Sequence, residues 1–502
     1  MIKLASVASP TRENSASQLH PSRRRRIIPV SILVVGLCAG CATSGSPAID
    51  PDRHFAGLRD ILDDLPDDGT LEVFLAHGMR VDATQTYADV IGAVASRLNL
   101  LTTEDTQHLQ PIPLVLEPPN VVLDGVPVFG EGSKAGSDWK QFQPRVTVEH
   151  WQTRSGHKHV NFYRFEYWEA LAFIKCQFVV APDTRVIGST TKFGGKTRSE
   201  FCALQPWDAP GSKQLSKLPE LGNQLLKSEI MEWGLSDAVI ATSQYRTVLR
   251  QAVREALQIT SRDAIAAAPP ALAAAGTSSA GGSSAIPDNY RYRFVFITES
   301  LGSYVISDAL DSLVTPTPVP AISASIGDAN ASGYAEQMRA AKFAICGATQ
   351  VHMLANQLAL LRLSELSVAA AGTPVAANAE TGADTVGGAS SATSHAHFFR
   401  GCQGGAWKAS HPQNGVAYGA WQVVAYHDPN DLLSYYTSDK PGAIGAANIE
   451  TTNVVVPYAP VWIPFVLGNP ITAHTGQAKV PAIMDLLACG HRVGTEPECR
   501  FQ

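Results

Sequence analysis

Residues 294–313 place one serine, Ser300, between a short apolar run and an amphipathic segment. The run 294–298 is aromatic and β-branched, which predicts a buried strand. After the serine, apolar residues recur at helical spacing and predict a helix face made of Val305, Ile306, Ala309, Leu310 and Leu313. A serine at a sharp turn from strand to helix, with the small residues Thr298 and Gly302 beside it, is exposed for reaction. The segment therefore predicts nucleophilic catalysis by the Ser300 hydroxyl.

A serine nucleophile needs a base, and among the histidines that follow Ser300 the best placed is His474. It lies in the segment 469–476, NPITAHTG, which we expect to be a loop between a strand and the helix that begins at residue 480. A base in such a loop can reach the carboxyl edge of the sheet, where the serine would also lie. A surface histidine without a catalytic role is the alternative interpretation.

Two aspartates could orient this histidine, because Asp428 and Asp431 both follow a strand expected to end near residue 426. Pro429 restricts Asp428 to an extended conformation. Asn430 readily adopts turn conformations, which can return Asp431 over the sheet edge toward His474. The sequence therefore favours Asp431 as the acid, with Asp428 as the competing candidate.

The segment His77-Gly78-Met79 ends another expected strand, 71–76, and could bind a developing oxyanion. Glycine lets the backbone approach a substrate closely. The expected donors are the N–H of Met79 and that of Leu301, the residue after the nucleophile. His77 itself is expected to be structural, and an ordinary tight turn is the alternative interpretation of the whole segment.

In chain order, the motifs HGM, TESLGS, YHDPNDLLSY and NPITAHTG resemble those of the α/β-hydrolase superfamily, and more narrowly exported bacterial hydrolase-like lipoproteins of unassigned substrate. The resemblance covers about residues 70–490, and Thr298 replaces the first glycine of the serine motif. It implies an α/β-hydrolase fold and a serine esterase or lipase-like activity on a small-molecule or lipid ester, without a metal or cofactor. An amidase or thioesterase would use the same triad. The competing hypothesis is a catalytically inactive scaffold that acts as an envelope binding protein.

Strands and helices alternate along much of the chain, which predicts a mostly parallel central sheet flanked by helices. The alternating elements are expected at 292–298, 302–314, 342–347, 350–364, 420–426, 451–457 and 480–489. In the helix expected at 350–364, the apolar face of Val351, Leu354, Leu358 and Leu361 indicates packing. The segments 145–151 and 160–167 predict a hairpin, and 246–258 predicts a further helix.

Domain boundaries follow from changes in composition. Residues 1–40 contain four consecutive arginines and an apolar run, which together are typical of an export signal. We expect a tether at 41–60 and a single domain at 61–502. Two segments rich in Ala, Ser, Gly and Pro, at about 264–287 and 369–394, are expected to be flexible insertions in it.

Cys41 follows Ala39-Gly40 and resembles the lipidated cysteine of a bacterial lipobox, although Cys38 stands where leucine is usual. This resemblance implies a lipid anchor, and Ala42 after it favours the outer membrane facing the periplasm. A plain secretory signal is the alternative. Without residues 1–40 the chain has 33 basic and 44 acidic residues, a net charge of −11, which argues against nucleic acid as a partner.

Six cysteines follow Cys41, an even number that is consistent with disulfides in an exported chain. Spacing favours the pairs Cys489–Cys499 and Cys176–Cys202, which leaves Cys346–Cys402, and buried free thiols are the alternative. His395 and His397 lie close together, but no third ligand accompanies them, so no metal site is expected.

Overall fold

The computed structural model describes residues within the range 47–492. These are 47–50, 53–79, 83–103, 110–116, 122–123, 126–127, 139, 142–178, 192–193, 196–197, 231, 234–268, 290–312, 328–362, 421–437, 449–459, 461–463, 467–468 and 470–492. The expected signal peptide with Cys41 and the expected insertion 369–394 lie outside the described residues.

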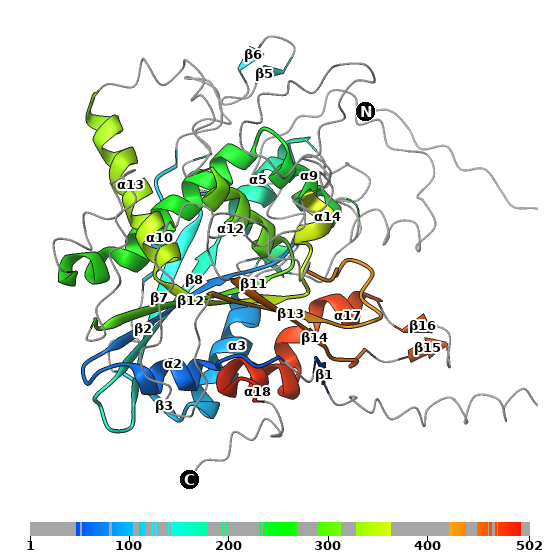
Figure 1. Ribbon diagram of the computed structural model, residues 1–502. Coiled ribbons are helices and arrows are strands. Elements are labelled where there is room, and N and C mark those ends of the chain that lie inside the picture. Colours follow the sequence, from blue (N-terminus) through cyan, green and yellow to red (C-terminus); the bar gives the residue numbers. More distant parts are fainter. Residues whose placement is uncertain are drawn as a thin grey trace, which may run out of the picture. The chain divides into compact units, whose positions relative to one another are not determined.

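A ten-stranded sheet forms the centre of the described domain, in the order β1-β14-β13-β12-β11-β2-β8-β7-β3, with β4 also paired to β7 (Figure 1). Its strands are β1 (Ala48–Ile49), β2 (Thr70–Ala76), β3 (Leu100–Thr102), β4 (Ile112–Pro113), β7 (Arg145–Thr153), β8 (His159–Glu166), β11 (Tyr292–Glu299), β12 (Ala348–Leu354), β13 (Trp421–His427) and β14 (Ile449–Val455). Small antiparallel pairs are formed by β5 (Val122–Leu123) with β6 (Val126–Pro127), β9 (Lys192–Phe193) with β10 (Lys196–Thr197), and β15 (Val461–Ile463) with β16 (Leu467–Gly468).

The large sheet is parallel at its centre and antiparallel at both edges. Strands β14, β13, β12, β11, β2 and β8 run parallel to their neighbours in this group. In contrast, β1 runs antiparallel to β14, and β7 runs antiparallel to β8, β3 and β4. The fold class is thus α/β with a mixed sheet, and the expectation of a mostly parallel sheet holds only for the six central strands. The difference arises because the hairpin β7–β8, expected from the sequence, joins the same sheet and extends it antiparallel.

Helices cover both faces of the sheet (Figure 1). They are α2 (Leu58–Asp64), α3 (Ala83–Arg97), α5 (Trp168–Phe178), α9 (Ser236–Thr242), α10 (Arg246–Ala267), α12 (Leu301–Asp311), α13 (Asp328–Cys346), α14 (Leu358–Arg362), α17 (Pro470–Thr475), the 3₁₀ helix η5 (Gln477–Lys479) and α18 (Pro481–Cys489). Within the described residues, no helix combines the length and the apolar character that a bilayer span requires.

An apolar core lies on each face of the sheet, between the strands and the helices. The strands contribute to both cores because successive side chains of a strand point to opposite faces. In β11, Phe294 and Phe296 enter the core shared with α5, α9, α10, α12, α13 and α14. Val295 and Ile297 of the same strand enter the other core, shared with α2, α3 and α18. The central strands are therefore apolar on both faces, as expected for buried parallel strands.

One pair of predicted elements is wrong. The strand expected at 342–347 is the end of helix α13, and the helix expected at 350–364 is strand β12 followed by the short helix α14. Val351 and Leu354 consequently lie in a strand and enter opposite cores, rather than one helical face with Leu358 and Leu361. The alanine-rich residues before Cys346 favour a helix, and this tendency outweighs the short apolar run that suggested a strand.

Two other segments are more ordered than their composition predicted. Part of the expected tether belongs to the domain, because Ala48 and Ile49 pair with β14 and Phe55 is buried with its backbone bonded to His491. Helix α10 continues to Ala267, so the expected insertion at 264–287 begins inside this helix; residues 269–287 lie outside the described residues.

Cys176, in α5, and Cys489, at the end of α18, are both disulfide-bonded. Cys202, Cys402 and Cys499 lie outside the described residues, so the pairing expected from spacing stays a prediction.

Candidate functional site

Ser300 occupies a sharp turn between β11 and α12. Its backbone has φ of 51° and ψ of −118°, a combination that residues with a side chain rarely adopt. Its N–H donates to the carbonyl of Leu354 at 2.8 Å, which ties the turn to the end of β12. A Cβ on Gly302 would lie 2.6 Å from the carbonyl oxygens of Ala76 and His77. Glycine is therefore required there, because α12 begins directly against the end of β2.

Thr298 stands where the serine motif of the resembled family has glycine, and the structure accommodates its side chain. It is fully buried, and its Oγ1 lies 2.8 Å from Ser303 Oγ and donates to the carbonyl of His352 at 3.3 Å. The hydroxyl thus links β11 to the first turn of α12 and to β12.

His474 contacts the serine directly, with 2.7 Å between its Nε2 and Ser300 Oγ. It lies in the short helix α17, whereas the sequence predicted a loop. Proline at the first helical position, Pro470, favours this helix because its fixed φ suits a helix start. Ser300 and His474 are 2% and 9% exposed, so their contact is largely shielded from solvent.

The two candidate acids have different partners. The Asp431 carboxylate accepts from His474 Nδ1 at 2.9 and 3.0 Å and from the N–H of Leu433 at 2.9 Å. Asp428 accepts instead from the backbone N–H groups of Asn430, Tyr458 and Ala459, at 2.7, 2.8 and 2.9 Å. Asp431 is thus brought to the histidine, whereas Asp428 joins the loop after β13 to the segment after β14.

Gly78 lies against the serine from the end of β2. A Cβ at this position would lie 2.8 Å from Ser300 Cβ and 3.3 Å from its Oγ, so a side chain would crowd the hydroxyl. Met79 follows immediately, while Leu301 opens α12. The first N–H groups of a helix have no acceptor within the helix, which leaves the Leu301 N–H suited to an oxyanion.

His77 has a role in packing rather than in chemistry. Its ring stacks on Tyr167 at 4.0 Å between centroids, its Nδ1 donates to the carbonyl of Gly78 at 2.6 Å, and its Nε2 accepts from the Tyr167 N–H at 3.3 Å. Tyr167 in turn donates its hydroxyl to the His77 carbonyl at 2.6 Å. These contacts fix the backbone that leads into Gly78.

Glu299, the residue before the serine, is a site residue that the sequence did not single out. Its carboxyl group is buried, and burial raises its pKa to about 7; the positive field of His474 and a hydrogen bond from the Gly78 N–H act against this rise. Glu299 thus accepts from the Gly78 N–H and lies close enough to His474 for the two groups to interact electrostatically. The sequence shows that Glu299 precedes the serine in TESLGS, but it does not show that the carboxyl group is buried.

Gln357 is the second residue that the sequence missed. Its Nε2 lies 3.1 Å from Nε2 of His474, and the side chain is 1% exposed. Asn356 and Gln357 belong to the helix expected at 350–364, whose apolar face indicated packing. Because β12 ends at Leu354, they instead follow a central strand, at the sheet edge where Ser300 lies. Reading residues 348–354 as a strand would have identified both as candidate site residues.

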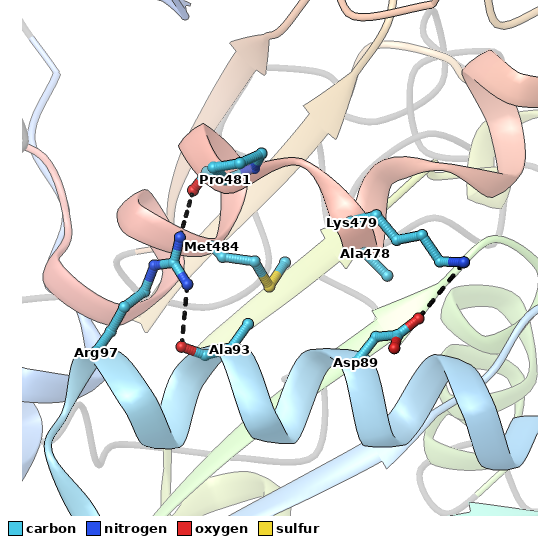
Figure 2. A pocket seen from close by; sticks show the side chains of 7 residues that line it. All are labelled: Asp89, Ala93, Arg97, Ala478, Lys479, Pro481 and Met484. Carbon is cyan, nitrogen blue, oxygen red and sulfur yellow. Dashed lines mark hydrogen bonds and ion pairs between the residues drawn. The ribbon is translucent and has the colours of Figure 1, made fainter.

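A separate hollow of about 420 Å³ lies between α3 and the segment η5–α18 (Figure 2). Its lining residues are Asp89, Ala93, Arg97, Ala478, Lys479, Pro481 and Met484. Arg97 donates to the carbonyls of Ala93 and Pro481, and Lys479 lies 3.6 Å from Asp89, so the charged groups are paired within the wall. None of the three residues of the serine–histidine–aspartate contact lines this hollow.

In the part of the chain that the structure describes, no group of three His, Cys, Asp or Glu side chains is placed to hold a metal ion. His395 and His397 lie outside that part. Comparisons of the chain with protein-family models, with curated proteins and with solved structures found no match.

Proposed function

We propose that this chain is a serine hydrolase of the α/β-hydrolase fold that cleaves esters through an acyl-enzyme. The observation that carries the proposal is the continuous contact from Ser300 Oγ to His474 Nε2, 2.7 Å, and from His474 Nδ1 to Asp431, 2.9 Å. The order serine, acid, histidine along the chain is that of α/β-hydrolases. The parallel centre of the sheet supports the same fold, since β11 and β13 end at one edge and carry the serine and the acid.

The chemistry follows from the three contacts. Ser300 Oγ attacks the ester carbonyl while His474 Nε2 takes its proton, and Asp431 holds the Nδ1–H tautomer and stabilises the imidazolium. The N–H groups of Met79 and Leu301 bind the oxyanion. His474 then protonates the leaving alcohol, and a water molecule releases the acyl group from Ser300 in the second half of the reaction.

A fluorophosphonate probe tests this proposal because it reacts with an activated serine and needs no knowledge of the substrate. We expect wild-type protein to be labelled on Ser300, and Ser300→Ala to lose the label. Ser303→Ala is a matched control: this buried serine lies one helical turn away and contacts Thr298 rather than His474. Folded wild-type protein that takes no label would contradict the proposal and favour an inactive scaffold that binds ligands in the cell envelope.

We further propose that the protein is exported and lipidated on Cys41, with an outer-membrane anchor facing the periplasm. The support is the arginine-rich and apolar sequence that precedes Ala39-Gly40-Cys41. An enzyme held at a bilayer would meet lipid esters at high local concentration, so lipid or small-molecule esters are the substrate class that we propose.

A further inference from the structure

Two donors converge on one nitrogen of His474. Its Nδ1–H is donated to Asp431, so in the neutral ring Nε2 has a single lone pair. Ser300 Oγ lies 2.7 Å from this nitrogen and Gln357 Nε2 lies 3.1 Å from it. One lone pair cannot fully satisfy both groups, and the shorter contact belongs to the serine.

The other end of the same amide is unsatisfied. Gln357 Oε1 is buried and has no hydrogen-bond partner among the described residues. A buried acceptor without a partner costs free energy, and such groups in native proteins often mark a functional site or the place of a bound water. The neighbouring Asn356 shows the contrast, because its Oδ1 accepts from the N–H of Leu358 at 3.0 Å.

We propose that Gln357 binds the water molecule that hydrolyses the acyl-enzyme, an assignment that rests on the proposed function. Once Ser300 carries the acyl group, its Oγ has no proton to donate, and a water molecule can take over the shorter of the two contacts at His474 Nε2. A water at this nitrogen donates one hydrogen to Nε2 and the other to Gln357 Oε1. It then has the two polar partners that a buried water needs, and it satisfies the amide oxygen.

The step balances with the groups present. The water oxygen forms a bond to the acyl carbonyl carbon as its proton passes to His474 Nε2. The tetrahedral intermediate collapses with cleavage of the bond between that carbon and Ser300 Oγ. The imidazolium returns the proton to Oγ, and the carboxylic acid leaves. Gln357 offers an acceptor to the water in the second half of the reaction, whereas in the first half its N–H only competes with Ser300 for His474 Nε2. Its removal should therefore slow the second half and not the first.

A chromogenic p-nitrophenyl ester separates the two halves, since the burst of p-nitrophenol reports acylation and the steady state reports deacylation. Gln357→Met keeps the length of the side chain and removes both polar atoms. We expect the burst rate not to fall, because only a competing donor to His474 Nε2 is lost, while the steady-state rate falls about 10²-fold because the water is no longer positioned. The acylated form should then accumulate, visible as added mass on Ser300. Gln357→Glu keeps an acceptor and should restore most of the deacylation rate.

Gln422→Met is the matched control, because it removes a buried amide of β13 that contacts Ala56 and Gln350 rather than His474. It should lower stability without separating burst from steady state. Equal loss of both rates in Gln357→Met, or loss of neither, would overturn the assignment while leaving the serine hydrolase intact. If Gln357→Met does not fold, Gln357→Asn, which withdraws the amide by one carbon, should give the same split. Absence of any acyl-enzyme in wild-type protein would overturn the proposed function itself, and this assignment with it.

Discussion

Two aspartates three residues apart in one loop have different partners, and their substitution should have different consequences. We expect Asp431→Asn to lower turnover about 10⁴-fold, because the amide cannot hold the Nδ1–H tautomer of His474 or stabilise its cation. Asp428→Asn should retain most activity and lose stability instead, since this carboxylate accepts the N–H groups of Tyr458 and Ala459. Turnover on a short-chain ester and urea unfolding of both variants measure the difference. A larger loss of turnover in Asp428→Asn would contradict the assignment.

Glu299 should make activity depend on pH near neutrality. Burial raises its pKa to about 7, so its carboxyl group gains a negative charge near the site as the pH rises through 7. A negative charge there stabilises the imidazolium that forms in the transition state, so kcat/KM of the wild type should rise across this range. Glu299→Gln stays neutral and should lack this part of the rise, while its amide still offers an oxygen to the Gly78 N–H. An equal rise of kcat/KM through pH 7 in both proteins would contradict the expectation.

At the scale of elements, the position of α12 depends on the absence of a side chain at Gly302. Gly302→Ala would force the helix away from the carbonyls of Ala76 and His77, so we expect about 1–3 kcal/mol of destabilisation and a marked loss of turnover. Gly92→Ala is the control, because a Cβ there meets nothing within 4 Å in the exposed middle of α3. That variant should be up to about 1 kcal/mol more stable with unchanged activity. Thermal unfolding and ester hydrolysis, measured in parallel, compare the two.

Elements with a uniform local pattern were predictable from the sequence. The strand before Ser300, the helix after it and the hairpin β7–β8 have apolar periodicities that match their structure. Strand β12 was not predictable, because Gln350 and His352 interrupt its apolar run. Their polar groups are satisfied by Ala56, Gln422 and Tyr426, which are remote in sequence. The same error concealed Gln357. The segments of Ser300 and Asp431 already indicated turns at strand ends, whereas His474 was chosen from its place in the chain order and lies in a helix rather than the expected loop.

For the whole molecule, the buried carboxyl group of Glu72 should make stability depend on pH. Burial raises its pKa from 4.5 to about 8, so the folded state holds this proton more tightly than the unfolded chain. The resulting stabilisation is complete below about pH 4.5 and is lost as pH rises toward 8, at about 1.4 kcal/mol for each unit of pKa difference. Glu72→Gln should remove this loss. Urea unfolding at pH 5 and pH 8 tests it, and an equal pH slope in both proteins would contradict the expectation.

The proposed anchor can be tested on the full chain. Cys41→Ser removes the thiol that would be lipidated, and should move the protein from the membrane fraction to the soluble fraction after export. Cys346→Ser, which leaves the proposed lipobox unchanged, is the control and should stay with the membrane. Unchanged membrane association of Cys41→Ser would rule out lipidation at this position.

The backbone conformation of Ser300 sets stability against activity at this position. At φ of 51° and ψ of −118°, glycine would have less conformational strain than serine, by about 1–3 kcal/mol. A change to glycine would therefore relieve this backbone strain and remove the hydroxyl. Ser300→Gly should accordingly unfold at a higher temperature than wild type and take no fluorophosphonate label. Such a result would mean that the stability of the wild type is lowered at the position where the proposed reaction needs a hydroxyl.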